Sequence, residues 1–512
     1  NKWHLALRFK PILNLHNPDG FNYRRWMLSK GYVVSATVDS KSPLNKILHS
    51  PGVTLRDYVS ETVNVKRTPI LRALLLGDKS GLEADDQRLI NRAGISHLFV
   101  VSGLHISLAA LFVVFIFTWL QRPWVIRHWR YSQAISLALG LMVAFLYGYL
   151  SGMNTPAIRA LIMLVCALFI LWGKRNLSAF VYWLLALVFV LVVSPLAFTG
   201  LGAWLSFGIV LALIVGMSGM KGEIDSSPGV SRIKMFVLTF KRYLFYLFRA
   251  QWFAFCGGAI ILIVFNVPVS PISFVLNICL IPVVSLFVVP LAFVGVATAL
   301  LSDTTILLFC EQILVNFIRF MNAFEGTVFS FFMIHDENRY LVVISFLMLL
   351  LPRSLFIYPL AALSLLLALN AKPGYPEVGA FKLMVFDVGQ GSSALITTNS
   401  HSILVDTGYG KKGSLGMTDY VVLPYLRKKG VTQLDKVFLT HDDADHAGGI
   451  GALKSQYKSI TRQGSCREES WKWDEVIFHQ FQSPDYKVGN NGTCLLRVES
   501  KNGASVLFAG DI

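Results

Sequence analysis

A succession of long apolar segments between residues 97 and 370 constrains the fold of this chain most strongly. The clearest candidates for membrane-spanning helices are residues 104–120, 134–150, 157–172, 178–194, 202–217 and 252–267. Because a helix rises 1.5 Å per residue, about 20 apolar residues cross a bilayer core, and some of these segments are close to the lower limit. Hydrophobic residues make up 54% of the 512-residue chain, which exceeds the usual share in soluble proteins. The sequence therefore predicts a polytopic α-helical membrane protein.

The remaining apolar segments are less regular. Residues 273–301 contain Pro282 and Pro290, which predict a broken or re-entrant helix because proline disrupts the helical hydrogen-bond ladder. Two further segments, 304–320 and 325–335, have the polar interruptions of amphipathic or interfacial helices. The last segment, 340–369, is interrupted by a proline followed by an arginine.

Charge is distributed unevenly along the chain. Residues 1–378 hold 31 Lys and Arg against 16 Asp and Glu, whereas residues 379–512 hold 15 against 14. Basic loops alternate with charge-poor loops: the basic ones are 121–133, 173–177 and 218–250, and the charge-poor ones are 151–156, 195–201 and 268–272. The positive-inside rule places the basic loops in the cytoplasm and both ends of the chain outside it. The same positive excess would suit the passage of a polyanion.

Soluble elements flank the membrane region. Residues 1–45 alternate β-prone runs with turn residues and indicate the end of a small β domain. Residues 46–96 form an amphipathic helical linker in which 69–76 ends at Gly77. Residues 379–512 predict an α/β sandwich, with strands at 381–387, 394–398, 402–406, 435–440, 493–498 and 504–509 and a helix at 418–429. The chain begins at Asn1 and stops just after Asp511, so we interpret it as a fragment.

Six cysteines are present, and none forms a Cys-x-x-Cys pair. Four of them lie in or beside apolar segments and are interpreted as small hydrophobic residues. Cys466 and Cys494 could pair if the C-terminal domain is extracytoplasmic, but the sequence leaves this open.

The chemistry is concentrated in the loop after the apolar residues 437–439. His441, Asp443, Asp445 and His446 follow within a few residues, and two glycines then allow a helix to start nearby. These are metal-ligand types at a spacing that a single turn can fold around one ion. Two more apolar strands deliver Asp406 and Asp511 at their ends. Three strand-end acids in one region favour a metallo-hydrolase over the alternative, an acidic surface turn with two incidental histidines.

Several motifs together resemble ComEC-type competence proteins over essentially the whole chain. In the membrane region they are residues 97–106, 149–160 and 277–282; in the C-terminal region they are 386–391, 406–408 and 440–446. Residues 17–25 resemble the end of the OB-type domain of that family. The resemblance implies an OB-type β domain (1–45), a helical linker (46–96), a polytopic channel domain (97–370) and a metallo-β-lactamase-like domain (379–512) that is incomplete at its C-terminus.

The resemblance also implies a function. The family imports one strand of transforming DNA across the bacterial cytoplasmic membrane, and its lactamase-like domain is implicated in degrading the other strand. The implied partners are single-stranded DNA, a DNA-uptake receptor, cytoplasmic proteins that handle the single strand, and membrane lipid. The implied metal ligands are His441, Asp443, Asp445, His446 and Asp511, and the implied catalytic or supporting acids are Asp387, Asp406 and Asp443.

Two positions depart from the pattern of the family. Asp443 stands where lactamase-like hydrolases usually carry histidine, and Ser392 stands where many relatives have an acid. One or two divalent ions would activate water and neutralise the phosphate in phosphodiester cleavage. The carboxylate-rich ligand set is compatible with Mn²⁺ or Zn²⁺, with Mg²⁺ as a third candidate.

Polar residues on apolar segments are costly in a bilayer, so each is a candidate for lining a DNA path. Arg159 is the strongest, because no acid lies near it in the sequence; the alternative is a snorkelling side chain at a helix end. The other candidates have structural alternatives as helix caps, packing groups or interhelical hydrogen bonds, and they are His105, Asn154, Gln251 and Asn277.

Three functions therefore compete. The first is DNA import with metal-dependent hydrolysis of the non-transported strand by a nuclease domain. The second is a membrane-anchored metallo-hydrolase of envelope or lipid phosphodiesters, which would not need so many spanning segments. The third is a transporter whose lactamase-like domain only binds DNA, against which the ligand set argues.

Overall fold

The computed structural model forms two compact units. The first contains Asn1–Ile12, Arg25–Phe331 and Val343–Ala361, and the second contains Leu13–Arg24, Phe332–Val342 and Ala362–Ile512. The structure describes residues 2–18, 20–49, 54–65, 68–99, 101–172, 178–218, 232–299, 301–323, 338–351, 357–370, 374–411, 413–431, 433–457, 461–462, 466–482 and 493–511.

The first unit begins with two small antiparallel sheets, as the β-prone runs predict. Strand β1 (Lys2–His4) pairs with β4 (Lys46–His49), and β2 (Leu7–Pro11) pairs with β3 (Val34–Val38). Helix α1 (Tyr23–Ser29) lies between β2 and β3 in the sequence. Between β2 and α1, the Gly20 amide donates to the Asn17 carbonyl.

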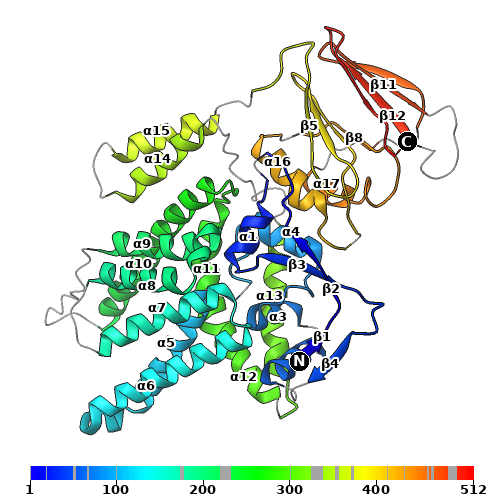
Figure 1. Ribbon diagram of the computed structural model, residues 1–512. Helices are drawn as coiled ribbons and strands as arrows, with labels where there is room; N and C mark the ends of the chain where they lie inside the picture. The colour runs from blue at the N-terminus through cyan, green and yellow to red at the C-terminus, as the bar shows by residue number, and fades with distance from the viewer. Residues whose placement is uncertain are drawn as a thin grey trace. The chain divides into compact units, whose positions relative to one another are not determined.

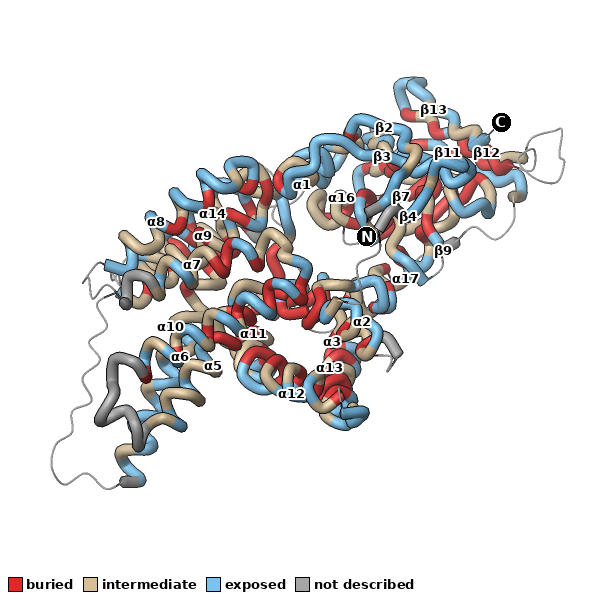
Figure 2. Tube along the Cα trace, turned by 60° about the horizontal axis from the view of Figure 1, so that its bottom comes forward, coloured by how far each residue is buried: buried red, intermediate tan, exposed pale blue. Residues whose placement is uncertain are grey.

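Three short helices follow: α2 (Leu55–Val65), α3 (Pro69–Leu76) and α4 (Ala84–Arg92). Helix α3 ends at Gly77, as predicted, but its apolar side chains are buried nearly all round, because it packs among the long apolar helices rather than on their surface. Figure 2 shows the concentration of buried residues where α3, α12 and α13 meet.

The apolar segments of this region are helical in their described parts (Figure 1). Five segments within those parts are long and apolar enough to cross a membrane. Their helices are α5 (Gly103–Leu120), α6 (Arg122–Leu150), α10 (Arg232–Val264), the continuous stretch α11 (Ile272–Pro282) to α12 (Val289–Ala299), and α13 (Thr305–Ala323). The shorter apolar helices are α7 (Thr155–Trp172), α8 (Ala179–Val193), α9 (Leu201–Met217), α14 (Arg339–Leu350) and α15 (Ile357–Asn370).

The structure corrects two boundaries. Helix α6 begins at Arg122 and α10 at Arg232, so much of the two predicted basic loops at 121–133 and 218–250 is helical. A 33-residue helix is roughly 50 Å long and extends beyond a bilayer core of about 30 Å. Basic residues occur in cytoplasmic loops and also where a helix extends beyond the bilayer, so the charge pattern alone favoured a loop.

The segment at 272–299 is also different from the prediction, because it is one continuous helix rather than a broken one. A stretch of π-helix (Val283–Val288) connects α11 to α12 between the two prolines. The wider π turn absorbs the disruption that proline causes in an α-helix. Helix α13 is long and apolar enough to span, although its sequence predicted an interfacial helix. The predicted segment 325–335 and loop 173–177 lie outside the described residues.

The second unit contains the predicted sandwich. Its five-stranded sheet has the order β5-β6-β7-β8-β9, and its four-stranded antiparallel sheet has the order β10-β11-β12-β13. The first sheet consists of β5 (Lys382–Val385), β6 (Ala394–Thr397), β7 (Ser402–Val405), β8 (Lys436–Phe438) and β9 (Thr461–Arg462). The second consists of β10 (Glu469–Trp473), β11 (Val476–Gln482), β12 (Cys494–Glu499) and β13 (Ser505–Phe508).

Two apolar clusters hold these layers together. One lies between the sheets and includes Ile396, Phe438, Phe478 and Leu496. The other packs the opposite face of the five-stranded sheet against helices, of which η4 (Thr418–Val422) and α16 (Leu423–Lys428) form the predicted helix and α17 (Ile450–Gln456) follows the metal-ligand loop. The domain is therefore layered as helices, five-stranded sheet and four-stranded sheet. The C-terminal ends of β7, β8 and β13 lie at one edge of these layers.

Candidate metal centre

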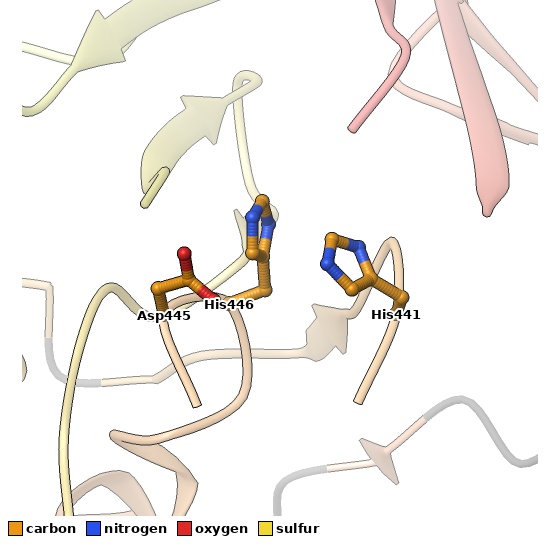
Figure 3. Close-up of side chains that lie close together, drawn as sticks. All are labelled: His441, Asp445 and His446. Carbon is orange, nitrogen blue, oxygen red and sulfur yellow. The ribbon is translucent and has the colours of Figure 1, made fainter. Parts of the chain in front are cut away.

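The loop after β8 gathers the predicted ligands. His441, Asp445 and His446 each offer a ligand atom, and these atoms lie within 4.8 Å of one another. Figure 3 shows the two imidazole rings side by side, with the Asp445 carboxylate next to His446. Their ring centroids are 3.9 Å apart. Two protonated imidazole rings at this distance would repel each other. The arrangement therefore requires that both rings be neutral or that a group of opposite charge lie between them.

Asp406 fixes the orientation of His446. It lies at the end of β7, almost fully buried, with its Oδ2 2.9 Å from His446 Nδ1. The carboxylate accepts that N–H, which leaves the lone pair of His446 on Nε2. Burial alone would lower the pKa of His446, but the hydrogen bond and charge of Asp406, with the charges of Asp511 and Asp445, raise it.

Thr440 fixes His441 in the same way. Its hydroxyl donates to Asp406 and lies 3.1 Å from His441 Nδ1, from which it can accept. The lone pair of His441 is therefore on Nε2 as well. Within the described residues, Nε2 of His441 and Nε2 of His446 are both buried and have no hydrogen-bond partner. Two unsatisfied imidazole nitrogens that face one region are the arrangement a metal ion requires.

Asp511 reaches this region from the end of β13. Its Oδ1 is 3.1 Å from His446 Nε2, without the geometry of a hydrogen bond, and its Oδ2 is 3.8 Å from His441 Nε2. The approach depends on Gly510, which has φ +60°; a Cβ there would lie 2.5 Å from Thr493 Cγ2 and 3.0 Å from Thr440 Cβ. The strand end can therefore approach the His441 loop only because residue 510 has no side chain.

Two other predicted acids occupy different positions. Asp443 is mostly exposed, with its Oδ2 3.6 Å from His441 Nε2, so it lies at the rim of the group. Asp387 is outside the three-residue group, and backbone amides occupy its carboxylate: His16 N donates to Oδ2 at 2.7 Å and Gly389 N to Oδ1 at 3.2 Å. This arrangement suits a turn anchor better than a base.

The residues present fit a divalent ion. Two imidazole nitrogens and the nearby carboxylates of Asp445 and Asp511 form a mixed nitrogen and oxygen donor set. Such a set is compatible with Zn²⁺, and its carboxylates also suit Mn²⁺ or Mg²⁺. The Asp406 carboxylate, bonded to His446 Nδ1, provides the hydrogen-bond support that metal-binding histidines generally have.

In the membrane region, Arg159 is buried on α7 rather than snorkelling. Its Nη2 donates to the Gly202 carbonyl at 3.1 Å and to Ser206 Oγ at 3.3 Å, both on α9. Its Nε has no hydrogen-bond partner, and no carboxylate pairs with it among the described residues. Lys30 lies near enough for the Arg159 charge to matter: burial, and then that charge, lower the pKa of Lys30.

The other membrane candidates are in mixed settings. Asn154 caps α7, since its Oδ1 accepts from Ala157 N at 3.0 Å. His105 is fully buried in the first turn of α5, where its backbone amide donates to Ser102 Oγ. Asn277 on α11 is buried with Oδ1 unsatisfied among the described residues, and Gln251 on α10 is half-buried.

Sequence reasoning missed several contributors. Thr440 and Ser392 support the histidines through Asp406, and Lys30 lies near Arg159. The position of Thr440 directly before His441 was a usable signal, whereas nothing local indicated Lys30. The structure also forms the disulfide that the sequence left open, with the Cα atoms of Cys466 and Cys494 5.5 Å apart.

The chain has helices long enough to cross a membrane, and a two-sheet domain with this cluster follows them. These features define a polytopic membrane protein with a metallo-β-lactamase-like domain. Residues 386–462 match the Metallo-beta-lactamase superfamily, whose fold implies divalent metal binding, and residues 74–366 match the family described as Competence protein. Because the second match covers more than half of the chain, this chain belongs to the competence protein family.

Several curated proteins are similar over nearly all of this chain. "Competence protein ComA" of Neisseria gonorrhoeae is 29% identical over 100% of this chain and 73% of its own length. "Recombination protein 2" of Haemophilus influenzae is 26% identical, covering 99% and 69%, and "ComE operon protein 3" of Bacillus subtilis is 23% identical, covering 97% and 68%. No solved structure matches the chain significantly.

Proposed function

We propose that this chain imports single-stranded transforming DNA across the bacterial cytoplasmic membrane, and that its lactamase-like domain hydrolyses the non-transported strand with a divalent metal. The observation that carries the proposal is the match to the competence family across the membrane region, joined in one chain to a cluster of unsatisfied imidazole nitrogens. DNA, a DNA-uptake receptor, cytoplasmic single-strand-handling proteins and lipid are the partners this function needs.

In the hydrolase part, each residue has a distinct task. Asp406 holds His446 as the tautomer with Nε2 free, and Thr440 does the same for His441. Asp445 and Asp511 supply carboxylate oxygens, and Asp443 lies at the rim where a phosphate would enter. A divalent ion held by these atoms would supply Lewis acidity and lower the pKa of a bound water.

In the transport part, Arg159 supplies positive charge away from bulk water. Its Nη2 is held by α9, and its Nε is left for another acceptor. A phosphate is a suitable acceptor, since it carries a negative charge and several oxygens. His105, Asn154, Gln251 and Asn277 are proposed as further path residues, with Asn154 acting also as the cap of α7.

We also propose that the N-terminal part and the lactamase-like domain lie outside the cytoplasm. The alternation of basic loops supports this sidedness, and so does the Cys466–Cys494 disulfide, because disulfides persist in oxidising compartments. A single cysteine introduced at the exposed Lys411 should react with a membrane-impermeant maleimide in spheroplasts. Reaction only after the membrane is breached would reverse the topology.

The test of function compares import with strand degradation in cells that carry one variant at a time. Doubly labelled duplex DNA reports the imported strand as nuclease-resistant label and the degraded strand as acid-soluble label. Arg159→Ala should abolish import but leave metal binding intact, and Asp445→Ala should abolish degradation. Arg249→Ala is the matched control, because Arg249 also donates to a helix carbonyl, that of Gly216, at 2.8 Å.

Normal import by the Arg159→Ala protein at wild-type abundance would remove Arg159 from the path. Unchanged acid-soluble label with Asp445→Ala would contradict the hydrolase assignment and favour a domain that only binds DNA. Hydrolysis of lipid phosphodiesters without any defect in DNA import would favour the membrane-anchored hydrolase instead.

A further inference from the structure

A short segment from the beginning of the chain is part of the second unit. Leu13–Arg24 clusters with the lactamase-like domain, although the residues on both sides of it belong to the first unit. Its Leu15 side chain packs against the apolar cluster formed by the five-stranded sheet and its helices. The segment is therefore packed into the domain, and it is not merely a linker that passes by.

Asn17 holds this segment to the Asp387 turn by a reciprocal pair of hydrogen bonds. Its Nδ2 donates to the Asp387 carbonyl at 2.7 Å, and its Oδ1 accepts from the Asp387 amide at 2.8 Å. His16 N adds a third bond, to Asp387 Oδ2 at 2.7 Å. One asparagine side chain thus satisfies both backbone groups of a residue that is 370 positions away in the sequence.

The turn that Asn17 holds touches the metal-ligand loop directly. Gly391, with φ +89°, lies so close to the backbone of Asp445 that an added Cβ would be 2.0 Å from the Asp445 carbonyl oxygen. The next residue, Ser392, donates from Oγ to Asp406 Oδ2 at 2.6 Å and lies 3.2 Å from His446 Nδ1. The turn therefore contacts one ligand through its backbone and another through its serine hydroxyl.

Ser392 is important to the orientation of His446. Its hydroxyl and the Nδ1 of His446 share the same Asp406 oxygen, so a shift of the turn changes how that carboxylate is shared. The Ser392 carbonyl also accepts from Gly408 N at 2.9 Å, in the loop that follows Asp406. Movement of residues 387–392 would consequently reach both Asp406 and Asp445.

We propose that Asn17 is a positioning residue of the metal centre: by holding the Asp387 turn, it sets Ser392 and Gly391 against Asp406, His446 and Asp445. The inference rests on the proposed metal site. It also gives Asp387 a role as the anchor to which the Asn17 segment binds, because its carboxylate is occupied by two backbone amides.

The test measures Mn²⁺ affinity of the full-length protein in detergent, from the electron paramagnetic resonance signal of free Mn²⁺, together with the thermal unfolding midpoint. Asn17→Ala removes both side-chain bonds. Asn45→Ala is the matched control, since Asn45 also makes one accepting and one donating bond, with Ala6 N and the Asp39 carbonyl, in the first unit. Ser392→Ala completes a double-mutant cycle with Asn17→Ala.

We expect Ser392→Ala to lower Mn²⁺ affinity about ten-fold, the lower end for groups that support a metal ligand, and Asn17→Ala to lower it by a factor of about 3 to 10. In the Ser392→Ala background, Asn17→Ala should lower affinity by less than about two-fold, because both changes act through one turn. Asn45→Ala should leave affinity unchanged. The spectrum of bound Mn²⁺ should change with Asn17→Ala.

Two results would overturn the proposal while leaving the metal site in place. One is an Asn17→Ala protein with wild-type Mn²⁺ affinity. The other is a double mutant whose loss of Mn²⁺ affinity is the product of the two single losses, which would mean that the variants act through a general loss of stability. Where Asn17→Ala does not fold, Asn17→Asp keeps the acceptor and replaces only the donor, and it should lower affinity as well; wild-type affinity in that variant counts against the proposal. A wild-type protein that binds neither Mn²⁺ nor Zn²⁺ would instead contradict the proposed metal centre itself.

Discussion

The lactamase-like domain and the helical region treat buried charge differently. In the domain, Asp406 accepts hydrogen bonds from Thr440, Ser392 and His446, so that every donor around it converges on one carboxylate. In the helical region, the buried charges of Arg159 and Glu311 lie apart, and mainly backbone groups satisfy each of them. Arg159 on α7 donates to α9, and Glu311 on α13 accepts from the first turn of α3.

The unsatisfied atoms differ in the same way. Among the described residues, two of the unsatisfied atoms in the domain are imidazole nitrogens that point to one place, within 4.8 Å of a carboxylate oxygen, whereas Trp471 Nε1 and Gln480 Oε1 lie elsewhere. The helical region leaves single atoms on separate helices, among them Arg159 Nε on α7 and Asn277 Oδ1 on α11. Convergent unsatisfied atoms are suited to one small ligand. Dispersed ones are suited to weak, repeated contacts with a ligand that moves, as a transported strand must.

The largest effect should come from removing one of the side chains that converge on the proposed metal site. Asp445→Ala should lower divalent-metal affinity by more than about 100-fold, because removing a ligand costs more than removing an outer-shell partner, which costs 10- to 100-fold. Asp443→Ala should have a smaller effect, since Asp443 is mostly exposed at the rim. Equilibrium dialysis with elemental analysis measures both.

Arg159→Ala is the control from the other region, and it should bind metal like the wild type. Equal metal content in the Asp445→Ala and wild-type proteins would remove Asp445 from the ligand set. Loss of metal in the Arg159→Ala protein would show that the two regions are not independent.

The sequence predicted the lactamase-like domain more completely than the helical region. Strand-end acids and a compact motif predicted His441, Asp445, His446 and Asp511 as one group, and the structure brings these side chains together because they follow strands that end at one sheet edge. The sequence could not predict that Asn17 binds Asp387, since a contact across 370 positions leaves no local pattern. Strands β10 and β11 were missed because their charged and aromatic residues do not alternate clearly.

In the helical region, hydropathy located most of the apolar helices and most of their ends, but not the starts of α6 and α10. The α10 boundary failed because basic residues predict a loop and also occur where a helix leaves the bilayer. The role of Glu311 was not predicted either, as its partners, the amides of Ile70 and Leu71, lie in a segment assigned to a peripheral linker. Only tertiary packing reveals that α3 is inside the helical unit.

A second, smaller effect should come from removing this buried acceptor. Glu311 accepts from Ile70 N at 3.0 Å and Leu71 N at 2.9 Å, and the residue before α3, Thr68, makes no side-chain cap bond. Glu311→Ala should lower the free energy of unfolding by about 1–3 kcal/mol, because two buried amides lose their partner. Glu311→Gln keeps one acceptor oxygen and should cost less.

The unfolding midpoint in detergent measures these changes, and Gln312→Ala is the control, since Gln312 is exposed and bonds Asn316 on the same helix. If Glu311→Ala and Gln312→Ala unfold at the same temperature, capping of α3 by Glu311 contributes nothing. Metal affinity should not change in either variant, which keeps this effect within the helical region.

The smallest effect concerns Asp474, at the turn between β10 and β11, where donors converge on a carboxylate as they do on Asp406 but near the surface. Burial alone would raise the pKa of Asp474, yet hydrogen bonds from Thr398, Ser400 and His401 hold the pKa well below its ordinary value. A depressed folded-state pKa stabilises the fold above the unfolded value of about 3.9, and this stabilisation disappears as the pH falls through the folded value.

Asp474→Asn should therefore lower the unfolding midpoint at pH 7, by an amount equivalent to about 1 kcal/mol. The difference from the wild type should begin to shrink below about pH 4, where Asp474 becomes protonated in the unfolded chain but stays ionised in the folded protein. Thermal melts of both proteins at pH 7, 5 and 3.5 test this, and a difference that is constant across the three values would mean that the charge of Asp474 does not stabilise the turn.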